Sequence, residues 1–358
     1  MLRPPGYQRL RAECRRIYVR APNWVGDVVM ATASFARIRA AFPEAHIVLA
    51  VRSWLEPLLH GTRWFDAVLP SPKAKGLGGL LAQARQVREG RFDLALVFPN
   101  SLESGLVPFL ARVPLRLGYR QGRPMLMNLG LRAGGGRPWW RRVGPRRTPV
   151  PMPVYYQRLL DVLGIPEHDP HPILAVTGEE EAAVDRYLAD KGVAPGARMV
   201  LLCAGASYGA SKFWDPDGFA AVARHFSARG FVPVFLAGPA EVEMVEAVAR
   251  KAGAVAATRP VLPLDQLKAL MRRGALLVTT DTGPRHLGVA FDIPIVCVIG
   301  PTDPRYTNYC LERTVLVRKD LECMPCQRKV CPLGHHLCMK SITAEEVIRA
   351  AEGLLARA

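Results

Sequence analysis

The run Ala275-Leu276-Leu277-Val278-Thr279-Thr280 passes directly into Asp281-Thr282-Gly283-Pro284-Arg285-His286, and this transition is the most informative feature of the chain. The apolar run predicts a buried strand, and the pattern at 287–291 predicts a helix after the polar loop. Pro284 suits a first helical turn, and Gly283 lets backbone approach a ligand closely. Such loops bind phosphates in α/β proteins, so we expect an anion or nucleotide site. An ordinary strand-to-helix turn is the alternative.

Apolar strand patterns alternate with helical patterns along the whole chain. The expected strands lie at 17–21, 45–51, 67–69, 93–98, 199–204, 232–237, 255–257, 275–280 and 293–299. This alternation predicts parallel βαβ units and therefore an α/β protein. We expect a basic N-terminal extension at 1–16, a first domain at 17–170 and a second domain at 171–342. A cysteine-rich segment lies at 310–338, and the last helix is expected at 343–358.

The charge is strongly positive, +17 over 358 residues, which favours an anionic partner such as nucleic acid, an acidic membrane or a phosphorylated substrate. No acidic residue occurs from Ser104 to Val150. The arginines of this block are Arg112, Arg116, Arg120, Arg123, Arg132, Arg137, Arg141, Arg142, Arg146 and Arg147, with Trp139 and Trp140 among them. Arginine matches carboxylates and phosphates bidentately, so we expect a surface for a substrate or lipid headgroup. A solvated basic surface is the alternative.

The chain contains no apolar run of the roughly 18 residues that a membrane span requires, and its N-terminus lacks the apolar region of a secretory signal. We therefore expect a cytosolic protein that can touch a membrane surface. Asp27 follows the first expected strand and precedes a helical pattern. It suits a helix cap, and the same position at the carboxyl edge of a strand suits a carboxylate in a cleft.

The stretch Gly205-Ala206-Ser207-Tyr208-Gly209 matches the nucleophile elbow of hydrolases, with Asp281 and His286 following in the right order. An elbow, however, needs a helix immediately after the serine, and the next helix signal is Asp215-Pro216. The intervening loop contains Lys212, which favours a phosphate-binding loop. An α/β hydrolase stays as an alternative.

Five of the eight cysteines come after residue 309: Cys310, Cys323, Cys326, Cys331 and Cys338, with His335 and His336 beside them. The spacing of the last four suits a tetrahedral zinc site or an iron–sulfur cluster. Reduced cysteines in a compact loop are the alternative. Cys14, Cys203 and Cys297 stand apart from this segment.

Taken together, the chain resembles the bacterial heptosyltransferases of lipopolysaccharide core synthesis (glycosyltransferase family 9), and their heptosyltransferase II branch most closely. The motifs that carry the resemblance are Pro22-Asn23-Trp24-Val25-Gly26-Asp27, Arg116-Leu117-Gly118-Tyr119-Arg120, Tyr155-Tyr156-Gln157-Arg158-Leu159-Leu160, Gly205 to Gly209 with Lys212-Phe213-Trp214, Asp281 to His286, and Gly300-Pro301-Thr302-Asp303-Pro304. The resemblance implies the GT-B fold, in which two Rossmann-like domains face a cleft. It also implies that the last helix returns to the first domain.

The resemblance further implies transfer of heptose from an ADP-activated donor to the inner core, with inversion at the anomeric carbon. By the same resemblance, Asp27 matches the general base and Lys212 the residue that neutralises the departing diphosphate. Donor contacts fall on Ser207, Glu241, Asp281, Thr282, Gly283 and His286. The chain departs from many relatives at Cys203-Ala204-Gly205-Ala206, where they have Pro-Gly-Ala, and at Phe213, where arginine is frequent.

We therefore expect a heptosyltransferase that uses an ADP-heptose donor and a lipid-linked core oligosaccharide acceptor at the cytoplasmic face of the inner membrane. Acceptor binding is assigned to Arg116, Arg120, Arg123, Arg141 and Arg142. We expect no cofactor for catalysis, and any zinc or iron–sulfur group at Cys323, Cys326, Cys331 and Cys338 would be structural. The alternatives are another acceptor (that of heptosyltransferase I, a later core heptose, or a protein) and a zinc-ribbon nucleic-acid-binding protein, although no nucleic-acid partner is expected.

Overall fold

The computed structural model describes residues 10, 13–132, 148–166, 169–206 and 208–357. These residues form two compact units that meet in sequence between Ile173 and Leu174. The sequence analysis placed the boundary at 170, and Ile173 belongs to the first unit because its N–H donates to the Thr32 hydroxyl at 2.8 Å. Within the described residues, no helix is both long and apolar enough to cross a membrane.

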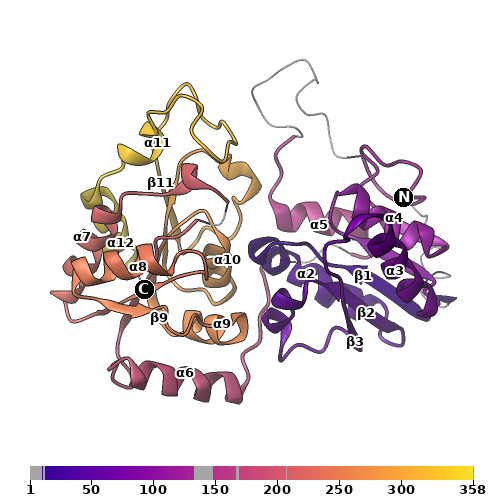
Figure 1. The fold of residues 1–358 in the computed structure, drawn as a ribbon, viewed down its shortest axis with the longest axis horizontal. Coiled ribbons are helices and arrows are strands. Elements are labelled where there is room, and N and C mark those ends of the chain that lie inside the picture. Colours follow the sequence, from indigo (N-terminus) through magenta and orange to yellow (C-terminus); the bar gives the residue numbers. More distant parts are fainter. Residues whose placement is uncertain (1–9, 11–12, 133–147, 167–168, 207, 358) are drawn as a thin grey trace. The chain divides into compact units, whose positions relative to one another are not determined.

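The first unit contains a parallel sheet of the order β3-β2-β1-β4-β5. Figure 1 labels three of its strands, with β2 between β1 and β3. Its strands are β1 (Arg16–Arg20), β2 (His46–Val51), β3 (Ala67–Pro70), β4 (Leu94–Val97) and β5 (Leu115–Gly118). The connecting helices are α2 (Val25–Ala41), the 3₁₀ helix η1 (Ser53–Leu59), α3 (Gly76–Glu89), α4 (Leu102–Leu110) and α5 (Met152–Asp161). Helix α5 packs on α2, and α3 packs on α4. Parallel strands all end at the same edge, so the loops after β1, β4 and β5 gather there.

The second unit contains a parallel sheet of the order β11-β10-β9-β6-β7-β8. The strands are β6 (Met199–Cys203), β7 (Val232–Leu236), β8 (Val255–Ala257), β9 (Gly274–Thr280), β10 (Ile295–Ile299) and β11 (Thr314–Arg318). The helices are α6 (Gly178–Asp190), η2 (Ala210–Lys212), α7 (Pro216–Ser227), α8 (Val242–Ala252), α9 (Leu264–Arg272), α10 (Gly283–Ala290), η3 (Pro304–Tyr306), α11 (Leu337–Lys340) and α12 (Ala344–Leu355). Strand order reverses between the neighbours β9 and β6, which places the loops after these two strands at a switch point where α/β proteins bind ligands.

Both faces of the second sheet are covered, as expected for parallel strands that are buried almost throughout. Alternate residues of β6, β9 and β10, such as Leu202 and Val278, belong to one core with Phe219 of α7 and Val347 of α12. The intervening residues point to the opposite face. There Leu277 and Ile295 lie against Gly288 of α10, so close that an added Cβ would approach them to 3.0 and 2.9 Å. Glycine at 288 therefore lets α10 approach the sheet.

The last helix, α12, is an integral part of the second unit. Thr343 and Glu346 form a reciprocal capping box at its N-terminus. Its buried residues Val347, Ala351 and Leu354 join the second core, and it packs on α7, β10 and β11. These contacts differ from the predicted return of 343–358 to the first domain, because the apolar face of the helix is used within its own unit.

Several elements were absent from the sequence prediction. Helix α4 and strand β5 lie in or beside the arginine block, which was treated only as a basic surface. Strand β5 is only four residues long and carries Arg116, so its strand pattern is weak. Strand β11 lies in the segment that was considered only for its cysteines. Helix α2 begins at Val25, so Asp27 lies inside the helix, whereas the helical pattern was expected to follow Asp27.

Candidate functional site

The carboxylate of Asp281 is the centre of the site in the second unit. It lies just beyond β9 and is only 7% exposed. One carboxylate oxygen accepts from Arg285 at 2.9 Å, and the other accepts from Lys212 at 3.0 Å and from the Thr302 hydroxyl at 2.8 Å. Burial alone would raise the pKa of Asp281, but Lys212 and then Arg285 lower it far below the ordinary range. Asp281 is therefore ionised and fixes the side chains around it.

His286 lies one helical turn into α10 and is held neutral. Its Nδ1 lies 2.8 Å from the Tyr309 hydroxyl, and the two rings stack with centroids 5.9 Å apart. Burial, followed by the positive charge of Arg285, lowers the pKa of His286 to about 3. A neutral imidazole that accepts from Tyr309 through Nδ1 would carry its proton on Nε2, where it is available as a donor.

The loop that was predicted to bind a phosphate lies at the N-terminus of α10. Thr282 is the N-cap residue, and Gly283 and Pro284 form the first turn. Thr282, Gly283 and Pro284 are partly exposed, whereas Asp281 below them is buried. The N–H groups of Thr282 and Arg285 donate to backbone carbonyls, and Pro284 has none. The helix dipole and the Gly283 N–H are therefore what this position offers to an anion. The ordinary strand-to-helix turn, which was the alternative, does not explain the buried charges beneath it.

Lys212 reaches the same point from the loop after β6. It is the last residue of η2 and 8% exposed, and its Nζ also donates to the backbone carbonyl of Asp281. The Nζ lies 5.0 Å from the centre of the Tyr208 ring. Ser207, predicted to stand beside it, lies outside the described residues. An α/β hydrolase would need the aspartate of its triad to hydrogen-bond the histidine. Here Asp281 is bound to Lys212 and Arg285, and the Nδ1 of His286 faces Tyr309, so the hydrolase alternative does not match.

Glu241 lies at the carboxyl edge of the same sheet, one strand further on. Its carboxylate accepts from the Gly238 N–H at 3.1 Å. It also fills the space beside Gly205, where an added Cβ would fall 1.9 Å from a carboxylate oxygen. Glycine at 205 therefore lets the carboxylate lie between the loops after β6 and β7. Glu241 and Lys212 thus belong to two loops that leave neighbouring strands at one edge.

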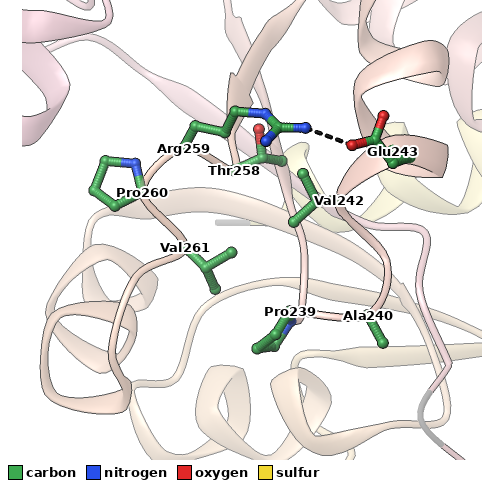
Figure 2. Close-up of a pocket in the computed structure, with 8 residues that line it drawn as sticks. All are labelled: Pro239, Ala240, Val242, Glu243, Thr258, Arg259, Pro260 and Val261. Atoms are coloured by element: carbon green, nitrogen blue, oxygen red, sulfur yellow. Dashed lines mark hydrogen bonds and ion pairs between the residues drawn. The ribbon is translucent and has the colours of Figure 1, made fainter.

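A cavity of about 480 Å³ lies between the loops that follow β7 and β8, and its lining includes both chain neighbours of Glu241 (Figure 2). Its lining residues are Pro239, Ala240, Val242, Glu243, Thr258, Arg259, Pro260 and Val261. Arg259 pairs with Glu243 at 2.6 Å across the rim. The lining combines apolar side chains with a few polar groups, which is the usual character of a small-molecule site. The cavity itself was not predicted, although the resemblance had assigned the neighbouring Glu241 to donor binding.

Asp27 occupies the first turn of α2 in the first unit. The N-cap residue is Trp24, so Asp27 is not the helix cap that the sequence suggested. The Tyr156 hydroxyl of α5 donates to one carboxylate oxygen of Asp27 at 3.0 Å. Nearby, Arg20 braces the loop after β1 through a 2.6 Å hydrogen bond to Asn23. Sequence analysis named the motif that contains Tyr156 but did not connect it with Asp27, since 129 residues separate them.

The described arginines of the arginine block do not all lie on the surface. Arg123 is 3% exposed and donates to the carbonyl oxygens of Pro99, Ser101 and Tyr119. Burial lowers its pKa to about 10. The assignment of Arg123 to acceptor binding is therefore wrong in this structure, because its guanidinium braces the loop after β4.

The other predicted acceptor residues divide into three cases. Arg116 donates to the carbonyl of Leu126 at 2.8 Å and also shapes the local loop. The Nε of Arg120 is buried and has no hydrogen-bond partner among the described residues, so Arg120 stays a candidate for acceptor binding. Arg141 and Arg142 lie outside the described residues.

The four cysteines Cys323, Cys326, Cys331 and Cys338 line one small cavity. Burial, followed by the three neighbouring thiols, raises the pKa of Cys338 to about 11. The structure therefore brings the predicted ligands together. No three ligand atoms of this segment lie within 4.8 Å of one another, so the thiols would have to move closer together to bind one ion.

Known proteins share this arrangement of sheets and loops. The model of glycosyltransferase family 9 (heptosyltransferase) matches residues 80–337. The chain belongs to glycosyltransferase family 9. This family 9 chain is 26% identical to lipopolysaccharide heptosyltransferase 2 of Escherichia coli (strain K12) over 352 residues, which cover 95% of the chain and 98% of the relative.

Solved structures show the same fold as the family 9 chain. The E. coli ADP-heptose LPS heptosyltransferase II has a TM-score of 0.77 and 23% identity, covering 96% of this chain and 99% of that one. A family 9 glycosyl transfer enzyme from Veillonella parvula DSM 2008 has a TM-score of 0.79 and 22% identity, covering 96% and 98%. The predicted family, the GT-B type of fold and the glycosyltransferase activity are thereby confirmed.

The neutral state of His286 predicts a pH dependence of stability. The unfolded histidine takes up a proton near pH 6.5, whereas the folded one does so only near pH 3, so the unfolding free energy should fall as the pH drops below about 6.5. The slope from this residue approaches about 1.4 kcal/mol per pH unit. Urea unfolding at several pH values between 7 and 4.5 should show a shallower slope in His286→Gln. Partly exposed His225 of α7 supplies the control His225→Gln, and equal slopes in all three proteins would contradict the prediction.

Proposed function

We propose that this enzyme transfers heptose from ADP-L-glycero-D-manno-heptose to a heptosyl-Kdo-lipid A type acceptor in the inner core of lipopolysaccharide, with inversion. Two findings support the proposal. The relatives that align with almost the whole chain are named lipopolysaccharide or lipooligosaccharide heptosyltransferase 2. The second unit also offers, at one sheet edge, a cationic phosphate site and a cavity that suits a nucleoside.

The donor would bind along this edge. The N-terminus of α10 and the Lys212 ammonium suit the diphosphate, because both present N–H donors toward an anion. Glu241 and the adjoining cavity suit the adenosine, with the carboxylate available to ribose hydroxyls. Neutral His286 can donate to a sugar or phosphate oxygen without adding charge. The single observation that carries the proposal is the buried cluster of Asp281, Lys212 and Arg285 directly beneath the phosphate loop.

Asp27 would be the general base. It takes the proton of the acceptor hydroxyl, whose oxygen forms the new bond to the anomeric carbon while the bond to ADP breaks. The electron pair of the broken bond goes to the diphosphate oxygen, where Lys212 offsets the charge. Tyr156 orients the Asp27 carboxylate through its hydrogen bond. This reaction needs neither a metal ion nor a cofactor.

The acceptor would be an anionic glycolipid at the cytoplasmic face of the inner membrane. The charge of +17 and the acid-free block support this location, and Arg120, Arg141 and Arg142 are the arginines best suited to its phosphates. The acceptor of heptosyltransferase I, a later core heptose or a protein would use the same donor chemistry. The acceptor panel below distinguishes them.

The decisive assay incubates the purified enzyme with ADP-heptose and a panel of truncated core acceptors, followed by mass spectrometry. We expect one added heptose on the acceptor that already carries the first heptose, and none on the acceptor that ends in Kdo. Transfer only to the Kdo-terminated acceptor would show that the enzyme has the acceptor specificity of heptosyltransferase I and not that of heptosyltransferase II. No transfer to any acceptor, with ADP-heptose intact, would overturn the proposal.

The role of Asp27 is tested by Asp27→Asn, which keeps the shape of the side chain and removes its basicity. Turnover should fall by about 100-fold or more, the usual contribution of a positioned base, while ADP affinity is kept. Tyr156→Phe should lower turnover less and shift its pH profile, because the carboxylate stays but loses its orienting bond. Turnover of Asp27→Asn within a few-fold of the wild type would reduce Asp27 to a structural residue of α2.

Lys212→Ala should weaken ADP binding and lower turnover together, because the charge on the leaving diphosphate loses its counter-ion. Asp281 retains Arg285 and Thr302 in this variant, so the fold should persist. Calorimetric ADP titration and steady-state kinetics measure the two effects, with Lys251→Ala, at an exposed lysine in the last turn of α8, as the control. An unchanged ADP affinity and rate would place the diphosphate elsewhere.

A further inference from the structure

The cavity lined by Cys323, Cys326, Cys331 and Cys338 is small and specific in its composition. Its volume is about 20 Å³, enough for a single water-sized occupant. Four sulfurs around so small a space form the donor set typical of a tetrahedral zinc or iron site. The volume favours one ion over an iron–sulfur cluster, which contains several atoms besides the ligands.

The two histidines that also line this cavity are already engaged elsewhere. The Nδ1 of His335 accepts from the Leu337 N–H at 3.0 Å. The Nε2 of His336 lies 2.6 Å from the carbonyl oxygen of Ser211, to which it donates. One nitrogen of each ring is thus engaged, but the four thiols by themselves complete a tetrahedral set of the Cys₄ kind, so no histidine ligand is needed. Their sulfurs would have to close to about 3.8 Å from one another, the separation that Zn–S bonds of about 2.3 Å impose in a tetrahedron.

Cys331 opens a tight turn in the cysteine segment. The Gly334 N–H donates to the carbonyl oxygen of Cys331 at 3.3 Å. Gly334 has a φ of +71°, a backbone conformation that favours glycine. The turn reverses the chain, and Cys331 and Cys338 line the same cavity.

The cysteine segment is bound to the turn that carries Lys212. The N–H of Ser211 donates to the Lys329 carbonyl at 3.0 Å, and the Ser211 hydroxyl donates to the Arg328 carbonyl at 2.5 Å. The Tyr208 hydroxyl donates to the Gln327 carbonyl at 3.0 Å. The two ends of the turn are thus held by residues between Cys326 and Cys331. Whatever fixes the cysteine loop also fixes the position of Lys212.

We propose that Cys323, Cys326, Cys331 and Cys338 bind one divalent ion of the zinc class (zinc or ferrous iron), and that this ion holds residues 323–338 against the 208–212 turn. The ion contributes no step to glycosyl transfer. Its effect is to keep the Lys212 ammonium beside Asp281, and only the consequence for ADP binding rests on the proposed function.

The site is tested first by metal content. Full-length protein purified without chelators or a histidine tag should contain about one equivalent of zinc or iron by elemental analysis. Replacement by Co²⁺ should give the visible bands of tetrahedral thiolate coordination. Cys331→Ser should lose the ion, whereas Cys310→Ser, at a cysteine that does not line the cavity, should retain it. Below about 0.2 equivalents, with the four thiols of the wild type freely titratable and no cobalt–thiolate spectrum, the site is overturned.

The bracing effect is tested by removing the ion with a chelator and measuring ADP affinity calorimetrically. We expect ADP binding to weaken at least several-fold and to recover when zinc is restored, with the acceptor's Michaelis constant unchanged. If the ion is present but its removal leaves the ADP affinity unchanged, the metal site stands and its proposed effect on Lys212 is wrong. If the proposed donor is wrong, the metal content and the cobalt spectrum still decide the site, because neither measurement depends on activity.

Discussion

The buried carboxylate of Asp281 is the constraint on which the ligand-binding edge of the second unit depends. A lone buried charge would cost several kcal/mol, and here it is offset only because partners arrive from separate elements. Lys212 comes from the loop after β6, Arg285 from α10 and Thr302 from the loop after β10. The loss of any one leaves a buried charge incompletely paired. The phosphate loop, the lysine turn and the loop after β10 are therefore fixed together before any ligand binds.

The candidate carboxylate of the first unit is held differently from that of Asp281. Its candidate base, Asp27, is only partly buried, and Tyr156 of α5 orients it through a neutral donor. A carboxylate beside a buried guanidinium would be held ionised but would be a poor base, as the lowered pKa of Asp281 illustrates. The two carboxylates thus suit different roles because their surroundings differ.

Local patterns made much of this arrangement predictable. The strand that ends at Thr280, the helix N-terminus at Gly283 and the phosphate loop between them follow from periodicity and turn chemistry, which act over a few residues. The pairing of Asp281 with Lys212 joins residues 69 apart, and that of Asp27 with Tyr156 joins residues 129 apart, so no local pattern encodes either. Arg123 was misassigned for the same reason. Its charge is visible in the sequence, but the carbonyls that bury it come from another strand's loop.

Lys212 connects the buried network with the surface that a donor would approach. An ammonium has three N–H donors, and two of those of Lys212 go to the backbone oxygen and carboxylate of Asp281. Within the described residues, this leaves one donor for a phosphate oxygen. A diphosphate can therefore gain a charge-assisted hydrogen bond without breaking the pair that stabilises Asp281. This holds only while the Lys212 ammonium keeps its position beside Asp281. The 208–212 turn sets that position, and hydrogen bonds from Tyr208 and Ser211 attach the turn to the cysteine segment.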